Sequence, residues 1–135
     1  MAESGQLDHV AVLVRDVDEA LGYWRDRLGL PVVHDEVNET ARARLTYLDA
    51  GGVFIQLLAP LDETAPLAAA LAADGEGLHH LCFAADDVLG RAAELADADA
   101  PAPRAGSGRG RPSAFVPGPP HHGVLVETTA ADGAA

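Results

Sequence analysis

Two histidines, one glutamine and one glutamate recur in the two halves of the sequence at a single separation. His80 follows His9 by 71 residues, and Glu127 follows Gln56 by the same 71 residues. The surrounding segments match as well, because LDHVAVLVRDV is similar to LHHLCFAADDV and GVFIQLL is similar to GVLVETT. Two separate segments that share one offset indicate an internal repeat. We therefore expect each half to place one histidine and one oxygen ligand at equivalent positions.

The adjacent residues His79 and His80 cannot both face one site. Successive side chains of a strand point to opposite faces of the sheet. The repeat places His80 at the position of His9, whereas His79 takes the position of Asp8. The sequence therefore predicts that His80 is the functional histidine.

The four repeated side chains together suit a divalent cation. Imidazole nitrogens with amide and carboxylate oxygens, and without thiolate, favour Co²⁺, Mn²⁺, Ni²⁺, Fe²⁺ or Zn²⁺ in an open five- or six-coordinate site. A single strand histidine is more often structural, and a single strand glutamine or glutamate more often faces solvent. The two matching pairs reverse this expectation. We predict four metal ligands: His9, Gln56, His80 and Glu127.

The elements that must position these residues follow the order β-α-β-β-β in each half. Strands of the first half are predicted at 7–14, 31–37, 43–50 and 53–59. Strands of the second half are predicted at 78–88, 113–118 and 123–129, with a strand fragment and a mobile loop within 100–112. Helices are predicted at 16–30 and 88–99, and a short alanine-rich helix within the connector 60–77. This pattern predicts an α+β fold of two βαβββ modules related by a pseudo-two-fold.

The first helix has signals at both ends and along one face. Asp16 can cap its N-terminus, and Gly29 can end it. Ala20, Leu21, Trp24 and Leu28 recur at helical spacing, so we expect them to form its buried face.

Length and composition are typical of one globular domain, with 135 residues, 48% hydrophobic and 22% charged. We expect a single domain over 1–135, with module one at about 5–60, a linker at about 61–77 and module two at about 78–129. The net charge of −12 argues against a nucleic-acid partner, because phosphate binding requires basic residues. The lone Cys82 cannot form an internal disulfide and is predicted to be a small buried residue.

The N-terminal segment MAESGQLDH lacks the basic and apolar regions of a signal peptide, and no apolar run approaches the length of a membrane span. We therefore expect a cytoplasmic protein without a membrane partner. The C-terminal segment 130–135 is predicted to fray.

Several segments resemble the vicinal oxygen chelate superfamily, which includes glyoxalase I, extradiol dioxygenases, antibiotic-resistance binding proteins and methylmalonyl-CoA epimerase. The segments are LDHVAVLVRDVDEALGYWRDRLGL, IQLLAPLDETAPLAAAL, GEGLHHLCFAADDV and GVLVET, and they are most similar to the methylmalonyl-CoA epimerase family. The first is common across the superfamily, whereas QLLAPL and GEGLHH are more specific. The resemblance implies modules whose mixed sheets curl into a cup around a metal.

The resemblance also implies the same four metal ligands. Gln56 is similar to the epimerase pattern, since glyoxalase I-like proteins usually carry glutamate there. The sequence departs from that pattern in two places. A turn containing lysine before the last strand is replaced by PGPPHH at 117–122, and a glutamate that some epimerases carry on the third strand, as a proposed base, falls near Leu45.

The activity that the resemblance implies is that of an isomerase, an epimerase or racemase of an acyl-CoA thioester. The α-proton would leave to form an enolate whose charge the metal stabilises, and would return on the opposite face. Glu127 is the main candidate for the catalytic acid or base. Weaker candidates are His121, His122, Glu36 and Glu39. The arginines that could hold a substrate carboxylate or phosphates are Arg42, Arg44, Arg109 and Arg111, although GSGRGR is also typical of a solvated loop.

Two alternatives remain. One is another metalloenzyme of the superfamily, a glyoxalase-like lyase, isomerase or dioxygenase with a biosynthetic substrate, although a dioxygenase would leave Gln56 unexplained. The other is a metal-free small-molecule or antibiotic-binding resistance protein, against which the four ligands and the aromatic content of 4% argue. Edge strands in such modules commonly pair, so we expect a homodimer.

Overall fold

The computed structural model describes residues 5–131, which form two compact units. One unit contains residues 10–79, and the other contains the described residues 5–9 together with 80–131. The segment 132–135 of the predicted frayed tail lies outside the described residues. No helix in the described part of the chain is long and apolar enough to cross a membrane. The single-domain organisation and the bounds of the modules stay predictions.

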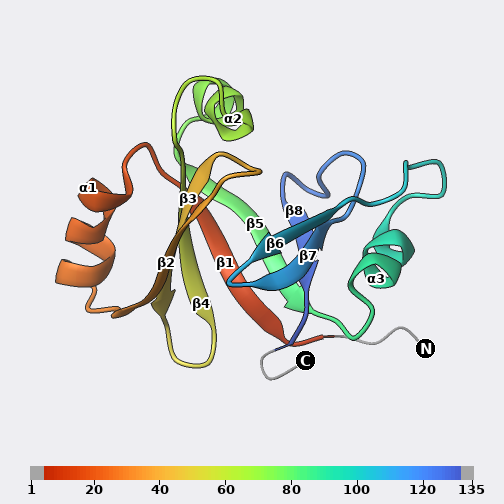
Figure 1. The fold of residues 1–135 in the computed structure, drawn as a ribbon, viewed down its shortest axis with the longest axis horizontal. Coiled ribbons are helices and arrows are strands. Elements are labelled where there is room, and N and C mark those ends of the chain that lie inside the picture. The colour runs from red at the N-terminus through yellow and green to blue at the C-terminus, as the bar shows by residue number, and fades with distance from the viewer. Residues whose placement is uncertain (1–4, 132–135) are drawn as a thin grey trace. The chain divides into compact units, whose positions relative to one another are not determined.

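The unit 10–79 contains the elements predicted for the first half of the sequence (Figure 1). They are β1 (Leu7–Leu13, here from Val10 onward), α1 (Val17–Leu21), its π-helical continuation η1 (Gly22–Arg27), β2 (Val32–Asn38), β3 (Ala43–Asp49), β4 (Phe54–Pro60) and α2 (Pro66–Asp74). The strand order is β2-β3-β4-β1, and β3 pairs in antiparallel fashion with both β2 and β4.

The first helix begins where the sequence predicts but changes its geometry along its length. The Asp16 carboxylate accepts a hydrogen bond from the Glu19 N–H at 3.2 Å. Over Gly22–Arg27 the turns are π-helical, and Gly29 follows with a positive φ of 88°. Wider turns alter the angular spacing of the side chains, so Leu28 leaves the buried face and is 51% exposed. The predicted burial of Leu28 is therefore wrong.

The second unit repeats the strand order of the first. It contains β5 (Gly77–Ala84, here from His80 onward), α3 (Val88–Leu95), β6 (Ala105–Gly108), β7 (Arg111–Phe115) and β8 (Leu125–Thr129). Its order is β6-β7-β8-β5, the counterpart of β2-β3-β4-β1. β5 and β8 are parallel, whereas β7 is antiparallel to both β6 and β8. The described residues thus confirm the repeated, mixed-sheet α+β fold.

Two apolar clusters form the core of the unit 10–79. One consists of Ala11, Leu13, Ala43, Leu45, Tyr47 and Leu58, with side chains of α2 packed against it. The other consists of Val14, Val17, Leu21, Leu48, Leu57 and Ala59, which join α1 to the strands. Because neighbouring strand residues alternate between faces, Tyr47 belongs to one cluster and Leu48 to the other. The sheet of this unit is therefore covered by apolar packing on both faces.

Truncation of Leu57, which is fully buried on β4, should lower the free energy of unfolding by about 2–5 kcal/mol, because Leu57→Ala loses apolar contacts and leaves a cavity. The half-exposed Leu28 provides a matched control, and Leu28→Ala should change it by less than about 1 kcal/mol. Urea unfolding followed by circular dichroism measures both. Equal losses in the two variants would show that Leu57 is not a core residue.

Candidate metal site

His9, His80 and Glu127 converge within the unit formed by residues 5–9 and 80–131. The Nε2 atoms of the two histidines are 3.2 Å apart. Glu127 Oε1 lies 3.3 Å from Nε2 of His9 and 3.2 Å from Nε2 of His80. The three residues are only 3%, 2% and 8% exposed, respectively. The structure therefore brings together three of the four residues predicted as ligands.

The parallel pairing of β5 with β8 explains how the side chains of His80 and Glu127 meet. His80 and Cys82 share one face of β5 because residues two apart in a strand point to the same side. Glu127 is the register partner of Cys82 across the two strands. Phe115 is in turn the register partner of Glu127 on β7, and its ring packs edge-on against His80 with centroids 4.9 Å apart. An aromatic side chain therefore borders the cluster.

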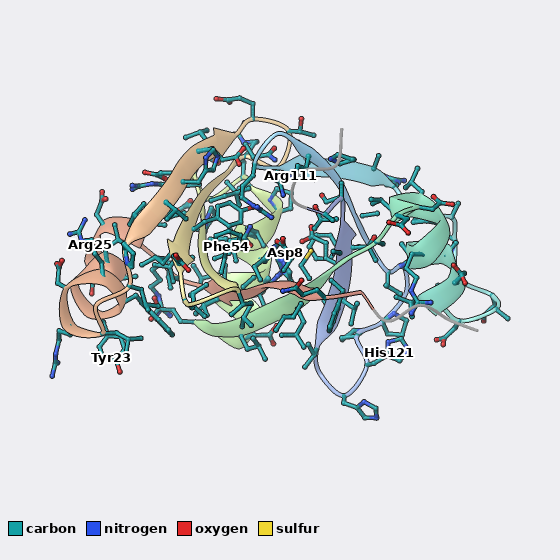
Figure 2. All side chains as sticks on the ribbon, turned by 90° about the horizontal axis from the view of Figure 1, so that it is seen from below. Asp8, Tyr23, Arg25, Phe54, Arg111 and His121 are labelled. Atoms are coloured by element: carbon teal, nitrogen blue, oxygen red, sulfur yellow. The ribbon has the colours of Figure 1, made fainter. Side chains whose placement is uncertain are left out.

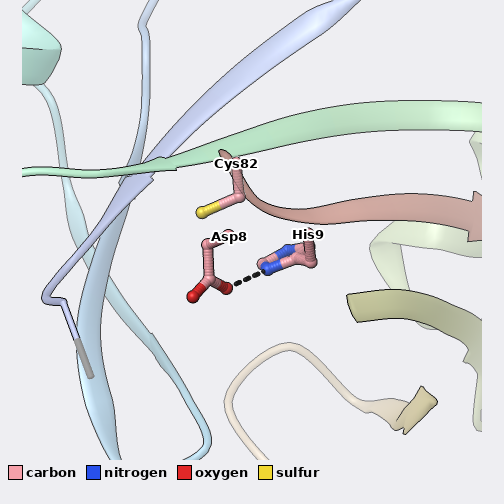
Figure 3. Close-up of side chains that lie close together, drawn as sticks. All are labelled: Asp8, His9 and Cys82. Carbon is pink, nitrogen blue, oxygen red and sulfur yellow. Dashed lines mark hydrogen bonds and ion pairs between the residues drawn. The ribbon is translucent and has the colours of Figure 1, made fainter. Parts of the chain in front are cut away.

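The second ring nitrogen of His9 contacts a carboxylate. Nδ1 of His9 lies 2.7 Å from Oδ2 of Asp8 (Figure 3), and the Arg109 guanidinium donates to the same oxygen at 2.5 Å. The repeat did not reveal Asp8, because its counterpart is His79 and strand alternation places it opposite His9. A signal was nevertheless present, since a charged residue inside an apolar strand needs a partner.

Cys82 is completely buried, as predicted. Its Sγ points toward Asp8 (Figure 3), and Asp8, His9 and Cys82 form a second close group of potential ligand atoms. Burial, together with the nearby carboxylates of Glu127 and Asp8, raises the pKa of the Cys82 thiol well above its ordinary range. The thiol therefore stays protonated at neutral pH in the protein without a metal.

The charges of the cluster depend on one another. Burial alone would lower the pKa of His9, but hydrogen bonds to Asp8 and Glu127 outweigh it and raise this pKa above 6.5. Burial alone would raise the pKa of Glu127, but the hydrogen bonds and charges of His80 and His9 hold it far below its ordinary value. Glu127 is thus ionised at neutral pH and requires positive charge beside it.

Gln56 lies on β4 in the unit 10–79. Its Nε2 donates a hydrogen bond of 2.7 Å to the hydroxyl of Tyr47, its register partner on β3. Its Oε1 is buried and has no hydrogen-bond partner among the described residues. Such an orphaned acceptor costs about 1–3 kcal/mol unless a donor or a cation completes it. The bond to the Tyr47 hydroxyl therefore fixes the orientation of the Gln56 amide and leaves its oxygen available.

The donor set fits a divalent metal. Atoms bound to one ion at about 2.0–2.2 Å stand roughly 3 Å apart when they are adjacent ligands, and the three cluster atoms are 3.2–3.3 Å apart. Imidazole nitrogens and a carboxylate oxygen are borderline and hard donors, as transition-metal ions of this class prefer.

Most of the arginines considered for substrate anions are engaged within the chain. The ion pairs are Arg42–Asp62, Arg44–Asp35, Arg44–Asp18 and Arg109–Asp8. The expectation that Arg109 lies in a solvated loop is wrong, because its side chain is only 9% exposed and its guanidinium contacts a buried carboxylate.

The weaker acid–base candidates do not belong to the cluster as the structure describes it. His121 lies away from Asp8 (Figure 2), in the loop before β8, where it pairs with Asp97 at 3.6 Å. Glu36 is on β2 in the unit 10–79, beside His34. Leu45, near which some epimerases carry a glutamate, is a core residue of that unit. Among these candidates, Glu127 alone is described in contact with both histidines.

Comparison with known proteins defines the family. Residues 8–115 match the model of the Glyoxalase/Bleomycin resistance protein/Dioxygenase superfamily. The chain is 30% identical over 128 residues to the ethylmalonyl-CoA/methylmalonyl-CoA epimerase of Cereibacter sphaeroides, covering 91% of this chain and 96% of that protein. It is also 30% identical over 125 residues to the uncharacterized protein YqjC of Bacillus subtilis, covering 90% and 89%.

The fold agrees with these sequence relationships. A solved methylmalonyl-CoA epimerase in complex with methylmalonyl-CoA and NH₄⁺ matches with a TM-score of 0.76 at 32% identity, over 97% of both chains. The shared fold, the family match and the relatives that span nearly the whole sequence lead to one conclusion: the chain belongs to the glyoxalase/bleomycin resistance protein/dioxygenase superfamily and is related to its methylmalonyl-CoA epimerases.

Proposed function

We propose that this protein is a metal-dependent epimerase that inverts the carbon next to the thioester of an acyl-CoA such as methylmalonyl-CoA. Relatives and a structural neighbour named as epimerases of such substrates support the proposal. The observation that carries it is the meeting of two imidazole nitrogens and a carboxylate oxygen within 3.3 Å in a buried place.

The proposed ligands of the metal are His9, Gln56, His80 and Glu127, and the candidate ions are Co²⁺, Mn²⁺, Ni²⁺, Fe²⁺ and Zn²⁺. When bound, such an ion supplies the positive charge that stabilises an enolate formed from the thioester. His9, His80 and Gln56 contribute no charge as ligands, whereas Glu127 contributes one negative charge. The site therefore keeps net positive charge with which to favour an anionic transition state.

Glu127 is proposed both as a ligand and as the group that moves the substrate α-proton. Although burial opposes its ionisation, His80 and His9 lower the pKa of Glu127 so far that its carboxylate is a weak base. The electrostatics therefore supports the ligand role more strongly than the proton-transfer role. Inversion also needs a group on the opposite face of the enolate, and the apolar side chain of Leu45 cannot provide it.

A different oxygen-chelating substrate at the same metal site is the second candidate. It is favoured by the burial of Leu45 in an apolar cluster and by the complete absence of lysine from the sequence. With Arg42, Arg44 and Arg109 already paired with carboxylates, few cations remain to hold the phosphates of a coenzyme A.

A homodimer is part of the proposal. β2 ends the strand order of its unit and leaves most of its residues exposed, which is typical of a strand that pairs with a second copy. The cytoplasmic location expected from the sequence stays a prediction.

Hydrogen exchange at the substrate carbon tests the reaction directly. We expect the Co²⁺-loaded protein to introduce deuterium at C2 of methylmalonyl-CoA in D₂O, as measured by mass spectrometry, because epimerisation requires removal of that proton. Protein treated with a chelator should not do so. Full Co²⁺ occupancy without exchange would reject this substrate and favour the second candidate.

The two adjacent histidines offer a matched pair of variants for the metal site. His80→Gln should lower Co²⁺ affinity by more than about 100-fold, beyond the loss typical for residues that only orient ligands, and Glu127→Ala should have a similar effect. His79→Gln should leave the affinity nearly unchanged. Elemental analysis and chelator competition measure both quantities. A comparable loss in His79→Gln, or unchanged metal content in Glu127→Ala, would contradict the ligand assignment.

Metal binding should depend on pH through His9. A proton on His9 competes with the ion, and Asp8 and Glu127 raise the pKa of His9 despite its burial. As the pH is lowered, the metal affinity should therefore start to decrease before pH 6.5 is reached. The lowered pKa of Glu127 means that this carboxylate adds no competing proton near neutrality. Chelator competition from pH 9 to pH 5 measures the profile. Constant affinity down to pH 6 would be inconsistent with His9 as a ligand.

A further inference from the structure

Arg109 occupies a position where arginine is unusual. It is the first of two residues that connect β6 to β7, since Gly108 is the register partner of Arg111. Arg109 and Gly110 have positive φ values of 55° and 70°, as a two-residue hairpin of the mirror-image type requires. Asparagine or glycine normally fills the first position, because other side chains are strained there. Residues held in such conformations often serve a function.

The side chain of Arg109 turns inward instead of extending into solvent. It is 9% exposed, and its Nη2 donates to Oδ2 of Asp8 at 2.5 Å. The carboxylate of Asp8 is also buried, with 6% of its side chain exposed. The tip of the β6–β7 hairpin is thus fixed to the beginning of β1 by a buried ion pair.

The same carboxylate oxygen receives a second hydrogen bond. Oδ2 of Asp8 lies 2.7 Å from Nδ1 of His9, while Nε2 on the other side of that ring faces His80 and Glu127 at 3.2 and 3.3 Å. The Asp8 carboxylate, ion-paired with Arg109, has no proton to donate and can only accept a hydrogen bond from the imidazole, so the Nδ1 atom carries a proton. In a neutral ring this leaves the lone pair on Nε2, the nitrogen that faces the cluster.

From these contacts we infer that Asp8 and Arg109 are positioning residues for the metal site, with Arg109 holding Asp8 and Asp8 holding His9 in the tautomer and orientation that a cation requires. The inference rests on the metal site proposed above and extends it to two residues outside the proposed ligand set. Carboxylates that accept from the distal nitrogen of a histidine ligand fix its ring and raise its basicity. Arg109 adds a fork of donors that keeps the carboxylate from rotating away.

Because Arg109 contacts Asp8 and Asp8 contacts His9, the Co²⁺ affinities of the single and double variants of Asp8 and Arg109 can be predicted. Asp8→Ala should lower Co²⁺ affinity by about 10- to 100-fold, as losses of such partners typically do, and Arg109→Asn should lower it by about 10-fold. Asparagine suits the positive φ of the turn, so this variant retains the hairpin. Because Arg109 acts through Asp8, the double variant should bind Co²⁺ no more weakly than Asp8→Ala alone.

Co²⁺ affinity measured by chelator competition is the main readout, and proton NMR of the Zn²⁺-loaded protein is the second. The Nδ1–H of His9, assigned by its loss in His9→Gln, should be protected from exchange in the native protein and exposed to exchange in Asp8→Ala. Arg109→Lys should restore part of the affinity that Arg109→Asn loses, because it keeps the charge without the fork. Asp35→Ala is the matched control, since Asp35 is also held by an arginine, Arg44, and it should change neither readout.

The outcomes separate this inference from the proposed function. Multiplicative losses in the double variant, or native affinity and native Nδ1–H protection in Asp8→Ala, would overturn the positioning role while leaving the metal site intact. Failure of His80→Gln and Glu127→Ala to weaken binding would instead remove the metal site itself. Circular dichroism establishes that each variant is folded. If Asp8→Ala does not fold, Asp8→Asn, which keeps the size of the side chain but loses its charge, replaces it in the same cycle.

Discussion

Three electron-rich atoms held against one another in a buried place set the main constraint on this protein. Two Nε2 atoms and a carboxylate oxygen lie within 3.3 Å of each other, and such a group is costly to bury unless positive charge compensates it. A proton or a metal ion can supply that charge. The parallel pairing of β5 with β8, the start of β1 and the edge-on ring of Phe115 all serve to hold this group together.

The two copies of the internal repeat carry different side chains at equivalent positions. The same strand order, β2-β3-β4-β1 and β6-β7-β8-β5, presents Gln56 on β4 and Glu127 on β8 at equivalent positions. The neutral amide is oriented by the Tyr47 hydroxyl and leaves its oxygen without a partner among the described residues, whereas the carboxylate is compensated by two histidines. In the proposed site, one negative charge among the ligands would leave a divalent ion with net positive charge that could stabilise an enolate.

The repeat made much of the fold and three of the clustered side chains predictable, because a common offset of 71 residues ties His9 to His80 and Gln56 to Glu127. Contacts that only one half of the chain makes could not be predicted from the repeat. Asp8 contacts His9 although strand alternation separates neighbouring side chains, and Arg109 is brought to it by a hairpin within a segment that is typical of a solvated loop. The π-helical turns that expose Leu28 could not be predicted, because the spacing of apolar residues does not distinguish them from α-helical turns.

X-ray absorption spectroscopy of the Co²⁺-loaded protein tests most directly whether His9, His80 and Glu127 bind one divalent cation, as we propose. We expect one tightly bound ion per chain with nitrogen and oxygen neighbours only, and with the multiple-scattering signature of two imidazoles. A folded protein that binds no Co²⁺, or an ion whose nearest neighbours include sulfur or fewer than two imidazoles, would contradict the proposal.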